Sequence, residues 1–260
     1  MDVVKVSSVN CLGKTNGCEF ASDEILNSLK SIYSNEKGEL LEFNLEEIKL
    51  DGGNVCEKIF SESKKFFGEK VIFLGGDHSI SYPLGKSFLN YCLERGEKFC
   101  LIVFDAHPDL MGPVDKNVPT SREWLRSLVN SGFPSENILL VGCRNSHLEE
   151  IDFAKKSGIR MVPISNLRED LEFVCHSIME FASGKKLYVS LDIDVVDPVF
   201  APGTGNLEVG GLTSREIIYL IQKINLIKGL SVVDIVEVNP SKDEMGLTCK
   251  LGAKILGELL

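Results

Sequence analysis

LYVSLDIDVVDP, residues 187–198, begins as a strand and ends in carboxylates. Its first half has the composition of an interior strand. Asp192 and Asp194 follow two residues apart, so on an extended chain both side chains would lie on one face, roughly 7 Å apart. Two carboxylates this close at the end of a buried strand repel each other unless a cation lies between them. The stretch does not fit an EF-hand, because the glycine at the sixth position and the closing glutamate are missing. It predicts a cation site, with an acidic surface turn as the alternative.

Outward from this stretch, apolar runs alternate with amphipathic stretches along the whole chain. We expect strands at residues 3–9, 40–43 (weak), 71–74, 99–104, 138–141, 161–163, 187–192 and 232–238. We expect helices at residues 25–33, 55–67, 80–92, 124–129, 148–156, 171–181, 214–224 and 246–260. Such alternation predicts an α/β fold with a mostly parallel sheet covered by helices on both faces. A closed (β/α)8 barrel has the same alternation, but the weak second strand and the modest length favour an open, doubly wound sheet.

Composition limits the class of protein. The 260 residues suffice for one large α/β domain, and no linker divides them, so we expect a single domain over residues 1–260. A net charge of −10 argues against a nucleic-acid partner and against a polybasic membrane anchor. We see no signal peptide, and no apolar run approaches the ~20 residues of a membrane span. The eight cysteines form no CxxC pair, which is typical of reduced thiols in a cytoplasmic protein.

Polar residues gather directly after three of the expected strands. GGDHS (75–79) follows the third strand, DAHPD (105–109) follows the fourth, and the central stretch ends in two aspartates. The carboxyl ends of parallel strands meet at one edge of a sheet, so six side chains can converge there: His78, Asp105, His107, Asp109, Asp192 and Asp194. Taken alone, GGDHS could be a turn into a capped helix, and His107 could be an ordinary polar residue.

The chemistry of these six side chains indicates what they would bind. Four carboxylates contribute −4 and two neutral imidazoles contribute nothing, so two divalent ions would balance the site. Hard oxygen ligands together with two histidines favour manganese over iron, cobalt or zinc. A structural zinc site would use cysteines in a closed tetrahedral shell. Two metal ions about 3.5–4 Å apart can share and deprotonate one water molecule.

GGDHS, DAHPD and SLDIDVVDP, in this order, resemble the three metal motifs of the arginase/agmatinase (ureohydrolase) family. VFAPGTGNLEVGGLTSRE (199–216), DIVEVNP (234–240) and GCEFASDEIL (17–26) resemble further segments of that family, so the likeness covers essentially the whole chain. The resemblance implies a three-layer α/β/α fold around an eight-stranded parallel sheet, usually assembled as a homo-oligomer, a trimer or hexamer. It also implies two Mn2+ ions per subunit and hydrolysis of a guanidino carbon to urea and an amine.

The resemblance also implies roles for individual residues. It divides the metal ligands into three pairs: His78 with Asp109 for one manganese, His107 with Asp194 for the other, and Asp105 with Asp192 as bridges. Glu237 would hold the substrate's guanidinium over the metals. Independently, Glu237 ends the last strand on the same sheet edge, and a planar guanidinium suits carboxylate hydrogen bonding. The alternative for Glu237 is a solvated side chain or a helix-end partner.

The sequence departs from the family pattern in the loop after DAHPD. A histidine thought to shuttle protons to the leaving amine is absent there, and the matching position falls near Ser121. An unperturbed serine hydroxyl cannot act as a general acid near pH 7. Another residue or a metal-bound water would then do the proton work, or the enzyme would be slow.

A second departure is GCRNSHLEE, residues 142–150, which offers Asn145 and His147 where arginases present acidic residues to the substrate's amino group. This weakens the case for L-arginine. We hypothesise that His147 reaches the substrate tail or supplies the missing proton function; the alternative is a surface histidine. No basic pocket for a carboxylate tail is evident, although Arg122, Arg126 or Arg144 could serve.

Together these features predict a dinuclear manganese hydrolase of a linear amidine C–N bond, most plainly an agmatinase-like enzyme acting on a small guanidino substrate. The alternatives are a formiminoglutamate-type amidino hydrolase, an arginase, or a catalytically weak metal-binding homologue with a regulatory role. The expected catalytic residues are Asp105, Asp192, Glu237 and His147. The expected substrate-binding residues are Glu237, Asn145, His147 and Ser121.

Overall fold

A computed structural model describes residues 1–10, 14–115 and 118–260. One sheet has the strand order β2-β1-β3-β8-β7-β4-β5-β6, with every neighbouring pair parallel. The strands are β1 (Asp2–Val6), β2 (Asn44–Glu47), β3 (Val71–Gly75), β4 (Phe99–Phe104), β5 (Ile138–Val141), β6 (Arg160–Val162), β7 (Lys186–Asp192) and β8 (Leu230–Val236). β2 and β6 are the two edges of this sheet, so the sheet is open and the barrel alternative is excluded. The expected open parallel α/β fold is confirmed.

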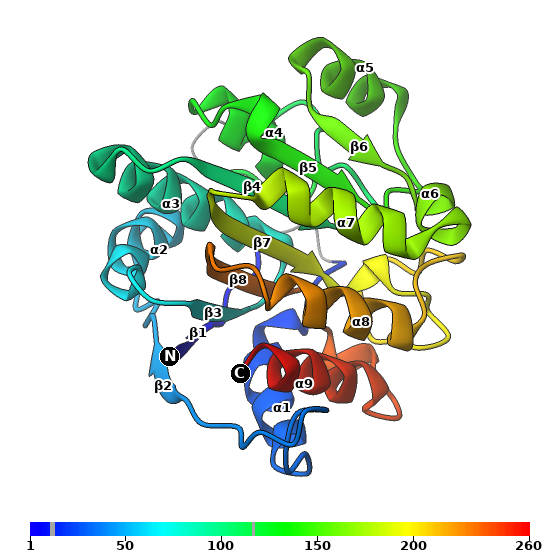
Figure 1. Cartoon of the computed structure of the whole chain (residues 1–260). Helices are drawn as coiled ribbons and strands as arrows, with labels where there is room; N and C mark the ends of the chain where they lie inside the picture. The colour runs from blue at the N-terminus through cyan, green and yellow to red at the C-terminus, as the bar shows by residue number, and fades with distance from the viewer. Residues whose placement is uncertain (11–13, 116–117) are drawn as a thin grey trace.

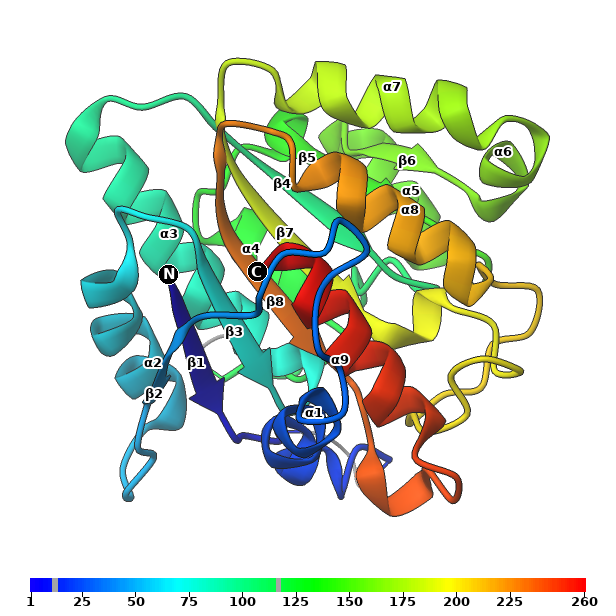
Figure 2. The same ribbon diagram turned by 60° about the horizontal axis from the view of Figure 1, so that its bottom comes forward.

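Helices cover both faces of the sheet (Figures 1 and 2). They are α1 (Ala21–Leu29), α2 (Val55–Ser63), α3 (Ser81–Arg95), α4 (Trp124–Asn130), α5 (Leu148–Ser157), α6 (Ile164–Glu169), α7 (Leu171–Ala182), α8 (Ser214–Ile224) and α9 (Leu247–Leu259). Apolar side chains of α1, α7, α8 and α9 pack on one face, and those of α2, α3, α4 and α5 on the other. In the part of the chain described, no helix is both long and apolar enough to cross a membrane.

The interior strands are apolar on both faces because each face is covered by a helical layer. In β3, Ile72 and Leu74 join the core under α1 and α9, whereas Val71 and Phe73 join the core under α2 and α3. Every residue of β3, β4 and β8 is buried. The four central strands, β3-β8-β7-β4, lie between these two cores, and the site is built at their carboxyl ends.

Two local expectations need correction. The second strand lies at Asn44–Glu47 rather than at 40–43, and its residues are all exposed, since an edge strand here pairs through its backbone and needs no apolar face. The first helix, α1, begins at Ala21 rather than at residue 25 and ends at Leu29 rather than at residue 33. The expected start of the helix at residue 124 is correct, and ahead of it both the backbone N–H and the hydroxyl of Thr120 donate to the Glu123 carboxylate.

The helix expected at residues 214–224 is confirmed as α8, and Thr213 and Glu216 form a complete capping box at its start. The seven described cysteines are all free thiols, and Cys11 lies outside the described residues. A single domain over residues 1–260 stays a prediction.

Candidate metal centre

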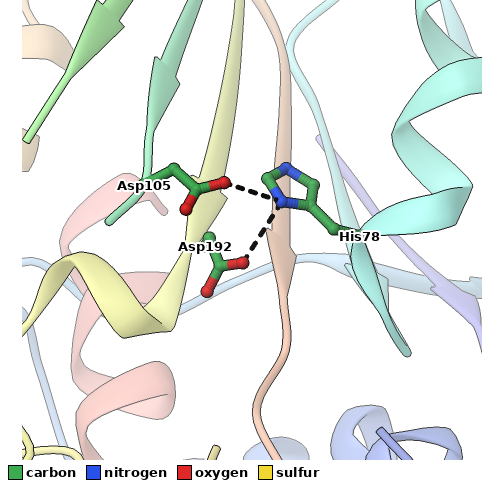
Figure 3. A group of neighbouring side chains, drawn as sticks. All are labelled: His78, Asp105 and Asp192. Carbon is green, nitrogen blue, oxygen red and sulfur yellow. Dashed lines mark ion pairs between the residues drawn. The ribbon is translucent and has the colours of Figure 1, made fainter. Parts of the chain in front are cut away.

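The four central strands deliver the site residues to one sheet edge. His78 opens a 3-10 turn after β3, Asp105 directly follows β4, Asp192 ends β7, and Glu237 directly follows β8. Figure 3 shows His78, Asp105 and Asp192 pointing toward one another from three of these strand ends. The parallel order of the strands thus brings together residues that are more than a hundred positions apart in the sequence.

The first cluster surrounds Nδ1 of His78. This nitrogen lies 3.1 Å from Asp105 Oδ2, 3.1 Å from Asp109 Oδ2 and 3.2 Å from Asp192 Oδ2. His78 is fully buried, and the three carboxylates are nearly so. The ligand atoms of His78, Asp105 and Asp192 lie close enough together to hold a metal ion, and Asp109 adds a third carboxylate beside the same nitrogen.

The second cluster surrounds Nδ1 of His107, which lies 3.4 Å from Asp105 Oδ1 and 3.0 Å from Asp194 Oδ2. Asp105 therefore offers one oxygen to each cluster, which is the geometry of a bridging carboxylate. Asp192 is grouped with the first cluster only, because Oδ2 is its one oxygen close to a ring nitrogen, so the bridge that the resemblance implied for Asp192 stays a prediction. The structure brings all six sequence-predicted side chains together.

The backbone of the central stretch differs from the expected extended chain. Ile193–Val195 is a 3-10 turn that begins directly after Asp192. The turn, closed by the Asp194 N–H to Asp192 Oδ1 bond, separates the two carboxylates so that each aims one oxygen into a different cluster. The convergence predicted from the sequence is correct, but the simple two-residue periodicity of a strand is not its cause.

The crowded carboxylates of this centre favour the binding of cations. His78 Nδ1 and Asp105 Oδ2 are completely buried and have no hydrogen-bond partner of good geometry among the described residues. Burial lowers the pKa of His78, but the carboxylates of Asp105, Asp109 and Asp192 outweigh it and hold that pKa well above the usual value. Burial and the charges of Asp194 and Asp105 raise the pKa of Asp192 well above its usual value. Divalent ions would relieve both the orphaned atoms and the crowded negative charge.

A buried hydrogen-bond chain orients His78. Its Nε2 lies 2.9 Å from the Ser190 hydroxyl, which donates to Asp234 Oδ1 at 2.8 Å. Ser81 donates to Asp234 Oδ2 at 2.8 Å, and Tyr188 also donates to that oxygen. Because the Ser190 proton is committed to Asp234, the serine oxygen accepts from Nε2–H, and Nδ1 is left free to bind a cation. Burial raises the pKa of Asp234, since the charged form loses solvation.

His107 has a different support. Its Nε2 lies 3.2 Å from Glu208 Oε1, which also accepts the side-chain amide of Asn145 at 2.8 Å. Arg144 fixes the loop that carries Glu208, donating to the backbone oxygens of Glu208 and Asp194, each at 2.6 Å. Glu208 was not predicted from the sequence as a site residue. Only its position within the family-like loop 199–216 points to the site.

Two non-glycine residues of the described chain have a left-handed backbone, and both belong to this site: Asp109 (φ 52°) and Glu237 (φ 63°). Such conformations are uncommon outside glycine and persist only where the surroundings hold them. Trp124 holds Asp109 by donating its indole N–H to Oδ2 at 2.8 Å, and its ring packs on His78 with centroids 4.7 Å apart.

Glu237 is 5% exposed, and its Oε1 accepts the backbone N–H of His78 at 2.9 Å. Its Oε2 has no hydrogen-bond partner among the described residues. Burial raises the pKa of Glu237 well above the usual value, because the charged carboxylate loses solvation there. The nearby negative charge of Asp77 raises this pKa further. A bound guanidinium would reverse that effect by supplying the missing positive charge.

Glu237 lines a cavity of about 450 Å³, together with five of the six clustered side chains: His78, His107, Asp109, Asp192 and Asp194. The two segments that depart from the family pattern also contribute to the wall of this cavity, through Ser121, Asn145 and His147. His147 is exposed and caps α5, where its Nδ1 accepts the Glu149 N–H at 3.3 Å and Glu150 completes a capping box. Asn145 is committed to Glu208, and Ser121 is half-buried.

Comparisons with known proteins agree with this geometry. A sequence model of the Arginase family matches residues 7–260. The chain is 31% identical over 206 residues to "Arginase 1, mitochondrial" of Oryza sativa subsp. indica, covering 77% of this chain and 58% of that protein. It is 31% identical over 197 residues to "Agmatinase" of Bacillus subtilis (strain 168), covering 74% and 63%. The matched part thus spans about three-fifths of these curated relatives.

Among solved structures, formimidoylglutamase from Bacillus subtilis subsp. subtilis str. 168 superposes with a TM-score of 0.85 at 25% identity, covering 99% of this chain and 85% of that one. The family match over nearly all of the chain, the shared fold and the paired acidic and histidine clusters lead to the same conclusion. This chain belongs to the arginase family.

Proposed function

We propose that this chain is a divalent-metal hydrolase of a linear amidine C–N bond, with agmatinase-like release of urea from a guanidino substrate as the favoured reaction. The observation that carries the proposal is Asp105, which both ligand clusters share, beside a cavity that Glu237 and the other five clustered side chains line. Relatives named arginase, agmatinase and formimidoylglutamase support amidine chemistry without selecting one substrate.

The residues would divide the work as follows. Two divalent ions, when bound by the six clustered side chains, would supply an acidified water as the nucleophile. Glu237 would bind the guanidinium through Oε2 and hold the reacting carbon in place, since Oε1 is committed to the His78 backbone. Trp124 and the Ser190–Asp234 pair would keep Asp109 and His78 oriented.

His147 is our candidate for the proton transfer that Ser121 cannot perform. Its Nδ1 accepts a backbone N–H, so the neutral ring carries its proton on Nε2, on a side chain that lines the cavity. Asn145 would act on substrate only indirectly, by fixing Glu208.

The finer identity of the enzyme extends the proposal. Manganese fits the oxygen-rich ligand set with two histidines, and the two clusters fit two ions per subunit. A homo-oligomer of three or six subunits and a cytoplasmic location remain predictions from the family resemblance and the cysteine pattern.

The function is tested by assaying manganese-loaded protein for urea and formamide with agmatine, arginine, 4-guanidinobutyrate and formiminoglutamate. Urea from a guanidino compound, lost in Asp194→Ala, is the expected result. Formamide from formiminoglutamate without any urea would move the reaction to the formimino branch. Two bound metals without turnover of any compound would favour the alternative of a non-catalytic, regulatory homologue.

The support of His78 gives a second prediction. Ser190→Ala removes the acceptor of the Nε2 proton, and we expect metal affinity to fall by about 10- to 100-fold. The measurement is competition with a metal chelator, followed by metal analysis. Ser87→Ala, another buried serine but on α3 and outside the centre, is the matched control and should bind metal normally. Unchanged affinity in Ser190→Ala would show that the chain from His78 to Asp234 does not act on the metal.

A further inference from the structure

The wall of the site cavity carries two cations, Lys14 and Arg122. Both side chains are exposed. Lys14 Nζ donates to the Asn206 side-chain oxygen at 3.2 Å, a neutral partner. Neither residue forms an ion pair with any carboxylate in residues 1–10, 14–115 and 118–260. Two exposed positive charges on a cavity wall, neither of them in an ion pair, favour an anion there.

The other two arginines near the cavity are already committed. Arg126 pairs with Glu149 at 2.6 Å, and its guanidinium packs over the Phe153 ring at 4.5 Å. The guanidinium of Arg144 donates hydrogen bonds to the backbone oxygen of Glu208 and to that of Asp194, in the turn after β7. Of the three arginines that the sequence offered for a carboxylate tail, only Arg122 both lines the cavity and lacks a charged partner.

Most acidic groups of the same wall are already committed. Glu150 is 6% exposed and accepts backbone N–H groups with both oxygens, from Leu110 at 3.0 Å and from His147 at 2.8 Å. Glu208 uses Oε1 for both His107 and Asn145, which leaves only Oε2 of this half-buried side chain for a cation. The remaining carboxylates belong to the two ligand clusters or, as Glu237, face the expected guanidinium. An ammonium tail would therefore meet Lys14 and Arg122 with only Glu208 Oε2 to offset their charge.

We propose that the substrate carries a carboxylate at the end opposite its amidine group, and that Arg122, assisted by Lys14, binds this carboxylate and sets specificity. The inference rests on the proposed function and narrows its substrate class to guanidino or formimino acids. It therefore keeps the agmatinase-like reaction, release of urea, but replaces agmatine, whose tail is cationic, as the favoured substrate. Arg122 matches a carboxylate with two parallel N–H donors, whereas Lys14 contributes a point charge. The bound substrate would therefore place its cationic amidine group at Glu237 and its anionic carboxylate at Arg122.

The test compares three guanidines of similar length that differ in the tail: 4-guanidinobutyrate (anionic), butylguanidine (neutral) and agmatine (cationic), with formiminoglutamate as a fourth compound. For wild-type, manganese-loaded protein we expect kcat/KM for the anionic tail to exceed that for the neutral tail by about tenfold, and that for agmatine by more. In Arg122→Gln the preference for the anion should fall by about tenfold, mainly through KM, since the tail is bound equally before and during reaction.

Two further variants sharpen the result. Arg122→Glu should reverse the order, so that agmatine becomes a better substrate than 4-guanidinobutyrate. Arg168→Gln removes the same charge from an exposed position on α6 outside the cavity and should leave all ratios unchanged. Equal or better use of agmatine by the wild type, or an unchanged preference in both Arg122 variants, would overturn the tail inference and leave the hydrolase intact. No product from any of the four compounds would overturn both.

Discussion

Asp105→Asn is expected to lose both metal ions and to reduce turnover by about 1,000-fold or more. The side chain gives Oδ2 to the cluster at His78 and Oδ1 to the cluster at His107. Asparagine keeps one oxygen, which can still accept the His107 backbone N–H as Asp105 Oδ1 does at 2.6 Å. It replaces the other oxygen with an amide group that cannot bind a cation, so the local fold survives while the bridge is removed.

Metal analysis after dialysis, together with the urea or formamide assay, measures this loss. Asp194→Asn is the graded comparison: of the two clusters, Asp194 belongs only to the one at His107, so we expect the variant to retain the metal at His78. Asp152→Asn, on the exposed face of α5, removes the same charge and should bind metal and turn over normally. Two ions retained by Asp105→Asn would contradict the bridging assignment.

The sequence predicted the convergence of these side chains well because they lie at strand ends, where local pattern and topology agree. Apolar runs locate β3, β4 and β7, and each run is followed at once by its polar ligands. The rule that parallel strands end at one sheet edge then suffices to bring the ligands together. The edge strand β2 was misplaced for the opposite reason: its exposed residues carry no apolar signal.

The supporting residues were missed because their role depends on contacts between strands that no short pattern encodes. Ser190 and Asp234 are polar positions inside apolar runs, and only the pairing of β7 with β8 shows that they adjoin each other. A carboxylate in the middle of a buried strand is costly unless it is satisfied, which is the one signal that could have marked Asp234.

The cavity wall was the least predictable part. The sequence did not distinguish Arg122, Arg126 and Arg144 as partners of a carboxylate tail. Whether each arginine is free to bind one depends on the carboxylate or backbone oxygen that it contacts in the fold. Asn145 and His147 do lie on the wall, but their side chains are partly engaged with Glu208 and with the start of α5. Such engagements follow from loop geometry, which is set by distant segments of the chain.

Glu237→Gln tests the other end of the proposed chemistry. We expect kcat/KM to fall by about 100- to 4,000-fold, because breaking a buried ion pair costs about 3–5 kcal/mol and each 1.4 kcal/mol is a factor of ten. Glutamine has the same shape, and its oxygen can still accept the His78 N–H that Glu237 Oε1 accepts at 2.9 Å. The substitution thus removes the charge and leaves the backbone contact in place.

The readouts separate substrate binding from metal binding. Glu237 belongs to neither ligand cluster, so Glu237→Gln should keep its metal content, unlike Asp105→Asn. Glu258→Gln makes the same change at a buried glutamate of α9, which pairs with Lys254 outside the cavity, and should leave kcat/KM unchanged. Metal loss in Glu237→Gln would instead show that Glu237 acts through His78, and wild-type kcat/KM would remove it from the reaction. The expected combination, full metal content with a large loss in kcat/KM, would identify Glu237 as the group that recognises the amidine cation.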